Sequence, residues 1–108
     1  MNSYTKSDLR SLELHKKIVE KLQKTPELWD VVFENINLLK KNNNSLSAAY
    51  KEWEEILSTK LKVEICNLLS ETTENAQRLR SSSPFSRILS EEERLEVFSS
   101  FSKFRRSA

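Results

Sequence analysis

The sequence predicts an all-α protein, and three observations lead to this prediction. Its 108 residues contain no glycine and only two prolines, whereas small sheet proteins need glycine, Asn-Gly or Asp-Gly to reach positive φ in their turns. Apolar residues recur at helical spacing along most of the chain. Between these runs stand residues that typically begin or end helices.

The length is enough for one domain with a modest core. We therefore expect residues 1–108 to form a single compact bundle of about five to six helices, with 1–6 and 105–108 loosely held. The bundle should contain an N-terminal antiparallel helical hairpin and a capped amphipathic helix at the C-terminus.

The first helix is expected from Ser7 or Asp8 to Lys24. Asp8 near its start and Lys21 and Lys24 near its end suit the helix dipole. His15, the only histidine, is expected at the surface or boundary. The apolar residues of this helix are Leu9, Leu12, Ile18, Val19 and Leu22, with Leu14 on a flank.

The second helix is expected to open at Thr25-Pro26-Glu27, since Thr caps, Pro fits the first position and Glu complements the positive end. It should end at Lys40-Lys41, and Asn42–Asn44 should form a turn because Asn tolerates the left-handed conformation. Ser45 or Ser47 should open the third helix. So short a link predicts an antiparallel hairpin.

Two shorter helices should follow. Ser58-Thr59 is expected to cap a fourth helix that carries Leu61, Ile65, Leu68 and Leu69, with Cys66 at its edge. Residues 70–74 should restart the chain as a fifth helix.

Residues 81–90 are predicted to form a non-helical break between the fifth helix and the last. Ser81–Ser83 and Pro84 end the fifth helix, and Phe85, Ile88 and Leu89 then form a compact apolar wedge. We expect the wedge to pack into the preceding helices and to fix the position of the last helix.

The last helix should begin with a capping box, in which the Ser90 hydroxyl accepts from the Glu93 amide and the Glu93 side chain reaches back. Lys103, Arg105 and Arg106 give its end the charge that the dipole prefers. Its apolar face is expected to comprise Leu95, Phe98 and Phe101, with Val97 and Phe104 beside them.

Residues suited to catalysis or metal binding are few. One histidine, His15, and one cysteine, Cys66, exclude an internal disulfide and His-His or Cys-His metal spacing. Without glycine there is no glycine-rich phosphate loop. The glutamates at 52, 54 and 55 and at 91–93 point in different directions on their helices, so neither run converges on one ion. We expect no enzyme, no catalytic residue, no cofactor and no metal.

No stretch approaches the ~20 apolar residues of a membrane span. The N-terminus also lacks the apolar core of a signal peptide. We therefore expect a cytoplasmic protein without a membrane partner.

Four arginines lie in or beside the 81–90 break: Arg78, Arg80, Arg87 and Arg94. They can neutralise Glu91–Glu93 and bind carbonyls at the end of the fifth helix, from which Arg78 and Arg80 should project. Alternatively they form a recognition patch for an acidic protein surface or for phosphates, since Arg makes two-pronged contacts with both.

The leading hypothesis is a non-enzymatic interaction protein that binds a protein partner. Its expected contact residues are Arg78, Arg80, Phe85 and Arg87, although Phe85 fits a purely core role equally well. The alternative is a small nucleic-acid-binding regulator that uses Arg78, Arg80, Arg87 and Arg94. A net charge of only +2 weighs against this alternative.

Four segments within residues 8–104 carry a resemblance to a protein family. They read SLELHKKI at 11–18, WEEIL at 53–57, RLRSSSPF at 78–85 and LSEEER at 89–94. The chain resembles a family of small, uncharacterised bacterial helical proteins, most specifically in the last two segments. Family members carry Ala-Gly or similar after the Phe, whereas this chain has Ser86-Arg87.

The resemblance implies an antitoxin-like protein, the small partner in a two-gene unit of toxin–antitoxin type. The protein partner would then be toxin-like or nucleotidyltransferase-like. The family brings no catalytic residues, so none is carried over to this chain.

Overall fold

The computed structural model describes residues 5–43 and 48–106, and the side chains of 5–41 and 48–100. All regular structure in this part of the chain is helical, which confirms the all-α prediction. The elements in chain order are α1 (Lys6–Lys24), the short 3-10 helix η1 (Pro26–Leu28), α2 (Trp29–Asn43), α3 (Ala48–Thr59), α4 (Lys62–Ser70), α5 (Glu74–Arg80) and α6 (Glu91–Arg106).

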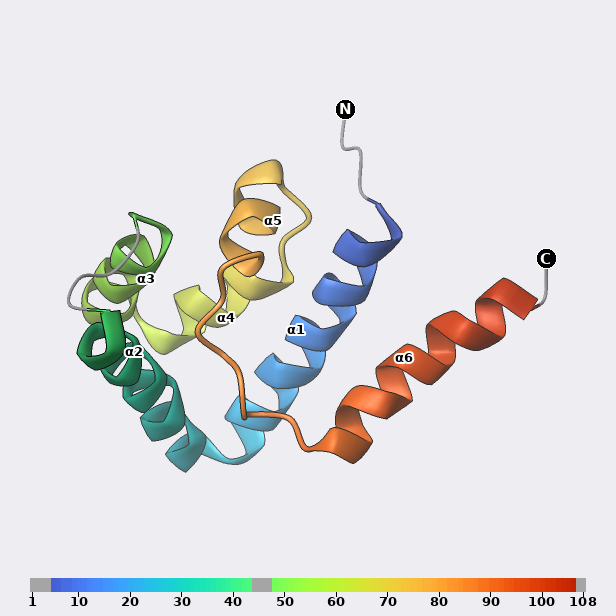
Figure 1. Ribbon diagram of the computed structural model, residues 1–108, viewed down its shortest axis with the longest axis horizontal. Helices are drawn as coiled ribbons and strands as arrows, with labels where there is room; N and C mark the ends of the chain where they lie inside the picture. The colour runs from blue at the N-terminus through green and yellow to red at the C-terminus, as the bar shows by residue number, and fades with distance from the viewer. Residues whose placement is uncertain (1–4, 44–47, 107–108) are drawn as a thin grey trace.

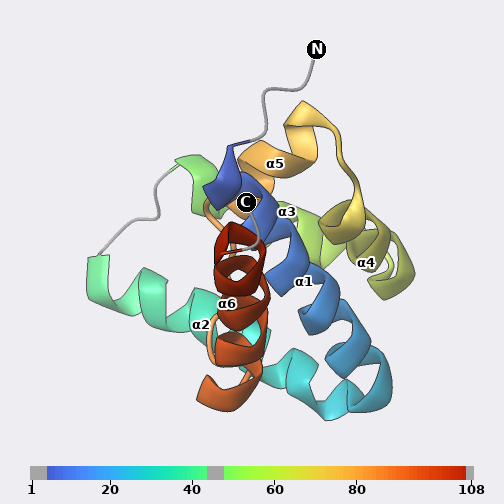
Figure 2. The same ribbon diagram turned by 90° about the vertical axis from the view of Figure 1, so that its right-hand side faces the viewer.

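Helix α1 is the centre of the bundle. It contacts α4, α5, α6 and η1. Figure 1 shows α6 on one side of α1 and the group α2 to α5 on the other. Helices α2 and α3 contact each other, and in Figure 2 α2 leads away from the centre while α3 returns to it. The chain between α5 and α6 runs back across the bundle, so the last helix depends on that segment for its position.

The start of α1 differs from the prediction because a capping box stands upstream. The Thr5 hydroxyl accepts from the Asp8 amide at 3.1 Å, and the Asp8 carboxylate accepts from the Thr5 amide at 2.9 Å. The helix therefore begins at Lys6, inside the stretch expected to be loose. At the other end of the chain, the backbone is helical through Arg106.

The second helix begins with a tighter turn than predicted. Pro26–Leu28 is a short 3-10 helix, and the Thr25 side chain makes no capping hydrogen bond. The backbone carbonyl of Thr25 instead accepts from the Leu28 amide at 3.0 Å. Helix α2 continues past the lysines through Asn43, so two of the three asparagines expected in a turn are helical. Asn44, Ser45 and Ser47 lie outside the described residues.

The expected cap at Ser58-Thr59 is wrong. Both residues belong to the last turn of α3, where their hydroxyls donate to the Glu55 carbonyl at 3.0 and 2.7 Å. Bonding back to a preceding carbonyl keeps Ser and Thr inside a helix. Helix α4 is capped by Glu64, whose carboxylate accepts from the Leu61 amide at 2.9 Å. The predicted start of the fifth helix within residues 70–74 is confirmed, since the Thr73 hydroxyl caps α5 by accepting from the Ala76 amide at 3.1 Å.

The apolar wedge packs into the preceding helices, as predicted. The Phe85 side chain is only 2% exposed. Its ring meets the rings of Trp53, Trp29 and His15 edge to face, with centroids 5.4, 6.0 and 6.4 Å apart. Ile88 and Leu89 are buried in the same core cluster.

Trp53 ties this core to α5. It is completely buried, and its indole N–H donates to the Leu79 carbonyl at 2.8 Å. A buried indole needs such a partner. Trp53 therefore fixes the end of α5 directly before the chain enters the 81–90 segment.

Helix α6 begins with the predicted capping box. The Ser90 hydroxyl accepts from the Glu93 amide at 3.2 Å, and the Glu93 carboxylate accepts from the Ser90 amide at 2.7 Å. The same carboxylate pairs with Lys21 of α1 at 2.5 Å. One turn further, Glu96 pairs with Lys17 at 2.7 Å. The two helices thus run antiparallel along an electrostatic seam.

The buried face of α6 is not the predicted one. Val97 is buried, Phe98 is half-buried and Leu95 is 54% exposed. Pairing with the lysines of α1 turns the Glu93, Glu96 and Val97 face inward, and Leu95 therefore points outward. The expectation for Phe101 falls outside the described side chains.

Replacing Phe85 by Ala should lower the free energy of unfolding by about 3–5 kcal/mol, because it removes the ring that joins two tryptophans and leaves a cavity. Urea unfolding followed by circular dichroism measures this change. Phe33→Ala is the matched control, since Phe33 is 40% exposed, and should change stability by about 1 kcal/mol or less. Equal effects of the two substitutions would contradict the central role of Phe85.

Candidate functional site

An open cavity of about 580 Å³ lies where α1 meets the 81–90 segment. Three of the arginines singled out in the sequence line it: Arg80 from the end of α5, Arg87 from the break and Arg94 from the first turn of α6. Phe85 lies in its wall. The fold thus collects side chains from distant positions, and no Asp or Glu is among the described residues that line the cavity.

Arg78 lies away from this cavity. Its guanidinium makes a two-pronged ion pair with Glu52 of α3 at 2.7 and 2.9 Å and also donates to Asn75 at 2.7 Å. The pair raises the pKa of Arg78 and lowers that of Glu52. Arg78 is therefore an exposed residue that links α5 to α3.

Arg80 is buried, with 4% of its surface exposed, so the expectation that it projects is wrong. Its Nη1 atom donates to the carbonyls of Leu69 and Glu71 at 3.2 and 2.6 Å. Carbonyls at a helix end lack partners within the helix, and here they are those of Leu69 in the last turn of α4 and of Glu71 directly after it, not those of the fifth helix as predicted. These bonds hold the guanidinium at the inner wall of the cavity.

Arg87 has a left-handed backbone, with φ of 70°, the one positive φ among the described residues. Such a conformation costs roughly 1–2 kcal/mol for a residue other than glycine. Asn35 of α2 holds this turn: its Nδ2 donates to the carbonyls of Pro84 and Ser86 at 2.9 and 2.7 Å. Arg87 in turn donates to the Asn35 Oδ1 at 2.6 and 3.0 Å. A weaker contact of 3.3 Å joins Arg87 to Glu34.

Sequence reasoning missed Asn35. The signal that could have found it is an amide between Val32 and Ile36, both buried on the inner face of α2. A polar side chain on such a face needs a partner. In a chain without glycine, that partner is the turn at Arg87.

His15 is also buried, at 7% exposure, where a surface or boundary position was expected. Its Nδ1 lies 2.7 Å from the Ser11 carbonyl and therefore carries the hydrogen. Its Nε2 is buried and has no hydrogen-bond partner among the described residues. Burial lowers the pKa of His15 to about 4, and the charge of Arg80 acts in the same direction. The imidazole in the cavity wall is thus neutral at pH 7.

Arg94 is exposed and lies over the ring of Phe98, with its guanidinium carbon 6.0 Å from the centroid. Arg10 of α1 lies over the same ring at 5.3 Å. Of these two arginines, only Arg94 lines the cavity. Within the described residues Arg94 forms no ion pair, so its charge is available in the cavity lining.

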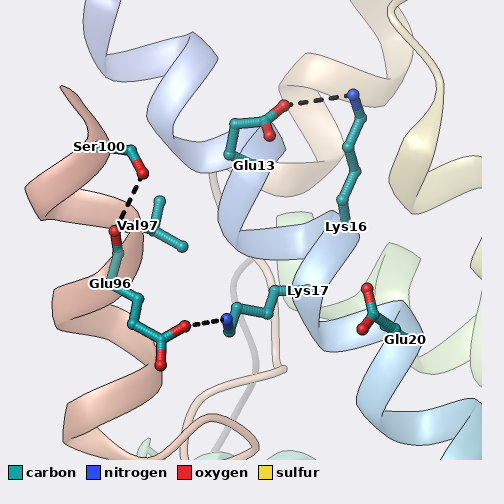
Figure 3. A pocket seen from close by; sticks show the side chains of 7 residues that line it. All are labelled: Glu13, Lys16, Lys17, Glu20, Glu96, Val97 and Ser100. Atoms are coloured by element: carbon teal, nitrogen blue, oxygen red, sulfur yellow. Dashed lines mark hydrogen bonds and ion pairs between the residues drawn. The ribbon is translucent and has the colours of Figure 1, made fainter. Parts of the chain in front are cut away.

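A second hollow, of about 400 Å³, follows the seam between α1 and α6 (Figure 3). Its charged side chains largely satisfy one another: Glu13 pairs with Lys16 at 3.2 Å, and Lys17 pairs with Glu96 at 2.7 Å. On the α6 wall, Ser100 donates to the Glu96 carbonyl of the same helix. We therefore interpret this groove as part of the packing between α1 and α6.

In the described ranges, no group of three or more His, Cys, Asp or Glu side chains could hold a metal ion. Cys66 is a buried free cysteine, and burial raises the pKa of its thiol. None of the helices in residues 5–43 and 48–106 has both the length and the apolar character needed to cross a membrane.

No protein-family model matches the chain, and searches of curated proteins and of solved structures gave no match either. The fold and the cavity thus define a small all-α protein with an arginine-lined hollow. The bacterial family suggested by the four sequence segments stays a prediction.

Because the His15 imidazole is buried, the free energy of unfolding should decrease as the pH is lowered from 6.5 towards about 4. The unfolded chain binds a proton at His15 below pH 6.5, whereas the folded chain does so only near pH 4. The free energy of unfolding should therefore drop by about 3 kcal/mol between pH 7.5 and pH 4. His15→Leu should remove most of this drop in urea titrations at the two pH values. If the free energy of unfolding of the His15→Leu variant still drops as it does in the wild type, another group causes the drop.

The seam between α1 and α6 should show a separate acid dependence. The hydrogen bond from Lys21, and then that from the Ser90 amide, lower the pKa of Glu93 from 4.5 to about 2. The stabilisation is present above pH 4.5 and disappears as the pH falls to about 2.

Glu93→Gln should therefore cost about 1 kcal/mol at pH 7 and nothing near pH 2, as measured by chemical unfolding. Glu91→Gln is the control, because Glu91 is exposed in the same first turn and makes the same change of charge. If the stabilities of Glu93→Gln and Glu91→Gln depended on pH in the same way, the ion pair between Glu93 and Lys21 would not contribute to stability.

Proposed function

We propose that this protein is a non-enzymatic protein-interaction module, an antitoxin-like or regulatory subunit that binds a protein partner through α6. One observation carries the proposal: Leu95 of α6 is 54% exposed on a helix whose C-terminal half extends away from the bundle. In Figure 1 this end of α6 lies at one extreme of the longest axis of the molecule.

The anchoring of α6 leaves one side of the helix open. Glu93, Glu96 and Val97 face α1. Leu95 lies on the opposite side, because successive helical residues are turned by roughly 100°. An exposed leucine on a projecting amphipathic helix suits binding in an apolar groove of a partner, where helical side chains at such spacing act as anchors.

Charge defines the partner further. Arg94 is exposed beside Leu95, and the sequence of the helix ends in Lys103, Arg105 and Arg106. We infer a partner groove with an apolar floor and a rim rich in carboxylates, since Arg pairs well with carboxylates. A toxin-like or nucleotidyltransferase-like protein, as implied by the sequence resemblance, is the partner to test first.

The four contact residues inferred from the sequence divide into two groups. Arg80 and Phe85 are interior residues: Arg80 ties the end of α5 to the end of α4, and Phe85 anchors the 81–90 segment in the core. Arg78 and Arg87 are exposed and stay candidates for direct contact. In this proposal, the interior pair affects binding by positioning α6.

The test is to identify the partner by affinity purification and mass spectrometry, and then to measure its affinity for variants of the full chain. Leu95→Glu should weaken binding at least tenfold, because it places a carboxylate against an acidic-rimmed groove. Val63→Glu is the control: Val63 is also an exposed apolar residue, at 61%, but lies in the first turn of α4. Its affinity should equal that of the wild type.

Two results would contradict the proposal. Equal affinities of the Leu95→Glu variant and the wild type would exclude α6 as the contact. Recovery of no protein partner, together with tight binding of random-sequence DNA that weakens steeply with salt, would favour the nucleic-acid-binding alternative.

A further inference from the structure

We propose that the arginine-lined cavity binds a small organic phosphate monoester. This inference does not depend on the protein-interaction role, although the cavity shares Arg87 and Arg94 with the surface proposed for the protein partner. The cavity collects Arg80, Arg87 and Arg94, and no carboxylate lines it among the described residues. His15 in its wall is neutral at pH 7, so the charge of the lining comes from the arginines.

The three arginines differ in how firmly they are placed. Arg80 is buried and held by the carbonyls of Leu69 and Glu71, and Arg87 is held by Asn35. The weak contact with Glu34 offsets part of the Arg87 charge at its exposed side. A binding site with two fixed guanidinium groups loses little conformational entropy when an anion enters. Arg94, which is exposed and lines the same cavity, can complete the contacts.

Hydroxyl groups supply donors beside the guanidinium groups. Ser83 and Ser86 line the same cavity, whereas the Ser81 hydroxyl, also in the lining, already donates to the Arg78 carbonyl at 2.6 Å. The Ser83 oxygen accepts from the Phe85 amide at 3.2 Å, which leaves its own hydrogen available to donate. Several donors around one anion suit a phosphate head, which offers three oxygens and a double negative charge, better than a carboxylate with two oxygens and a single charge.

The size of the cavity and its apolar wall indicate that the ligand carries an organic group in addition to the phosphate. A volume of about 580 Å³ falls within the roughly 300–1,000 Å³ typical of small-molecule sites and far exceeds the need of inorganic phosphate. Leu14, Ile18 and Leu89 supply an apolar wall beside the arginines. An ester with a small aromatic or apolar group therefore fits both parts of the cavity.

The probe is phenyl phosphate, titrated into the full chain by isothermal calorimetry at low salt. Inorganic phosphate presents only the head, and benzoate presents a carboxylate on a similar body. We expect phenyl phosphate to bind at least tenfold more tightly than either. Its addition should also shift the amide resonances of Ser83 and Ser86, which reports the location of binding without any substitution.

Arg94→Gln should weaken phenyl phosphate binding at least tenfold. Arg10→Gln is the matched control, because Arg10 lies over the same Phe98 ring but does not line the cavity, and it should bind as the wild type does. The proposal fails if phenyl phosphate does not bind at 10 mM, if benzoate binds equally well, or if the two variants behave alike. It also fails if the shifted resonances lie away from residues 81–94.

Discussion

The edge-to-face packing of Phe85 against Trp29 and Trp53 is the interaction on which the rest of the structure depends. These rings belong to three separate parts of the chain, and the His15 ring brings in α1 as a fourth. Aromatic pairs in this geometry are worth about 0.5–1.5 kcal/mol each beyond their burial. The wedge therefore fixes the path of the 81–90 segment, and that path fixes where α6 begins.

The second constraint is the absence of glycine. The segment that carries Phe85 has to turn through a left-handed residue at Arg87, where most chains would place glycine. Asn35 makes this turn possible by bonding the carbonyls on both sides of Phe85. Since Arg87 also bonds Asn35, the residue that bears the strained backbone contributes to holding it.

The sequence allowed the helical class, the capping box at Ser90 and the burial of Phe85 to be predicted, because local spacing and capping chemistry determine them. It did not allow the burial of His15 or Arg80 to be predicted. Arg80 is buried where the carbonyls at the end of α4 accept its hydrogen bonds, and His15, whose own hydrogen bond is to Ser11 in the same helix, is buried where the Phe85 ring packs against it. Such partners depend on how helices meet, which local pattern does not encode.

The candidate site was predictable in part for the same reason. The clustering of arginines around the break was visible in the sequence, and three of them line one cavity. The separation of Arg78 from the others depends on Glu52 of α3, a residue 26 positions away. Likewise, the inner face of α6 was assigned by hydrophobicity to Leu95, whereas ion pairs with α1 select Glu93 and Glu96.

The rotation of α6 about its own axis links the two proposed surfaces. Pairing of Glu93 with Lys21 directs Val97 inward, and the same rotation places Arg94 at the arginine cavity and Leu95 toward solvent. Turning the helix by two residues, roughly 200°, would bring Leu95 to the buried position that Val97 now occupies and would move Arg94 from its place in the cavity lining. The electrostatic seam with α1 therefore does more than attach the last helix: it determines which side chains of α6 are available to a partner and which reach a ligand.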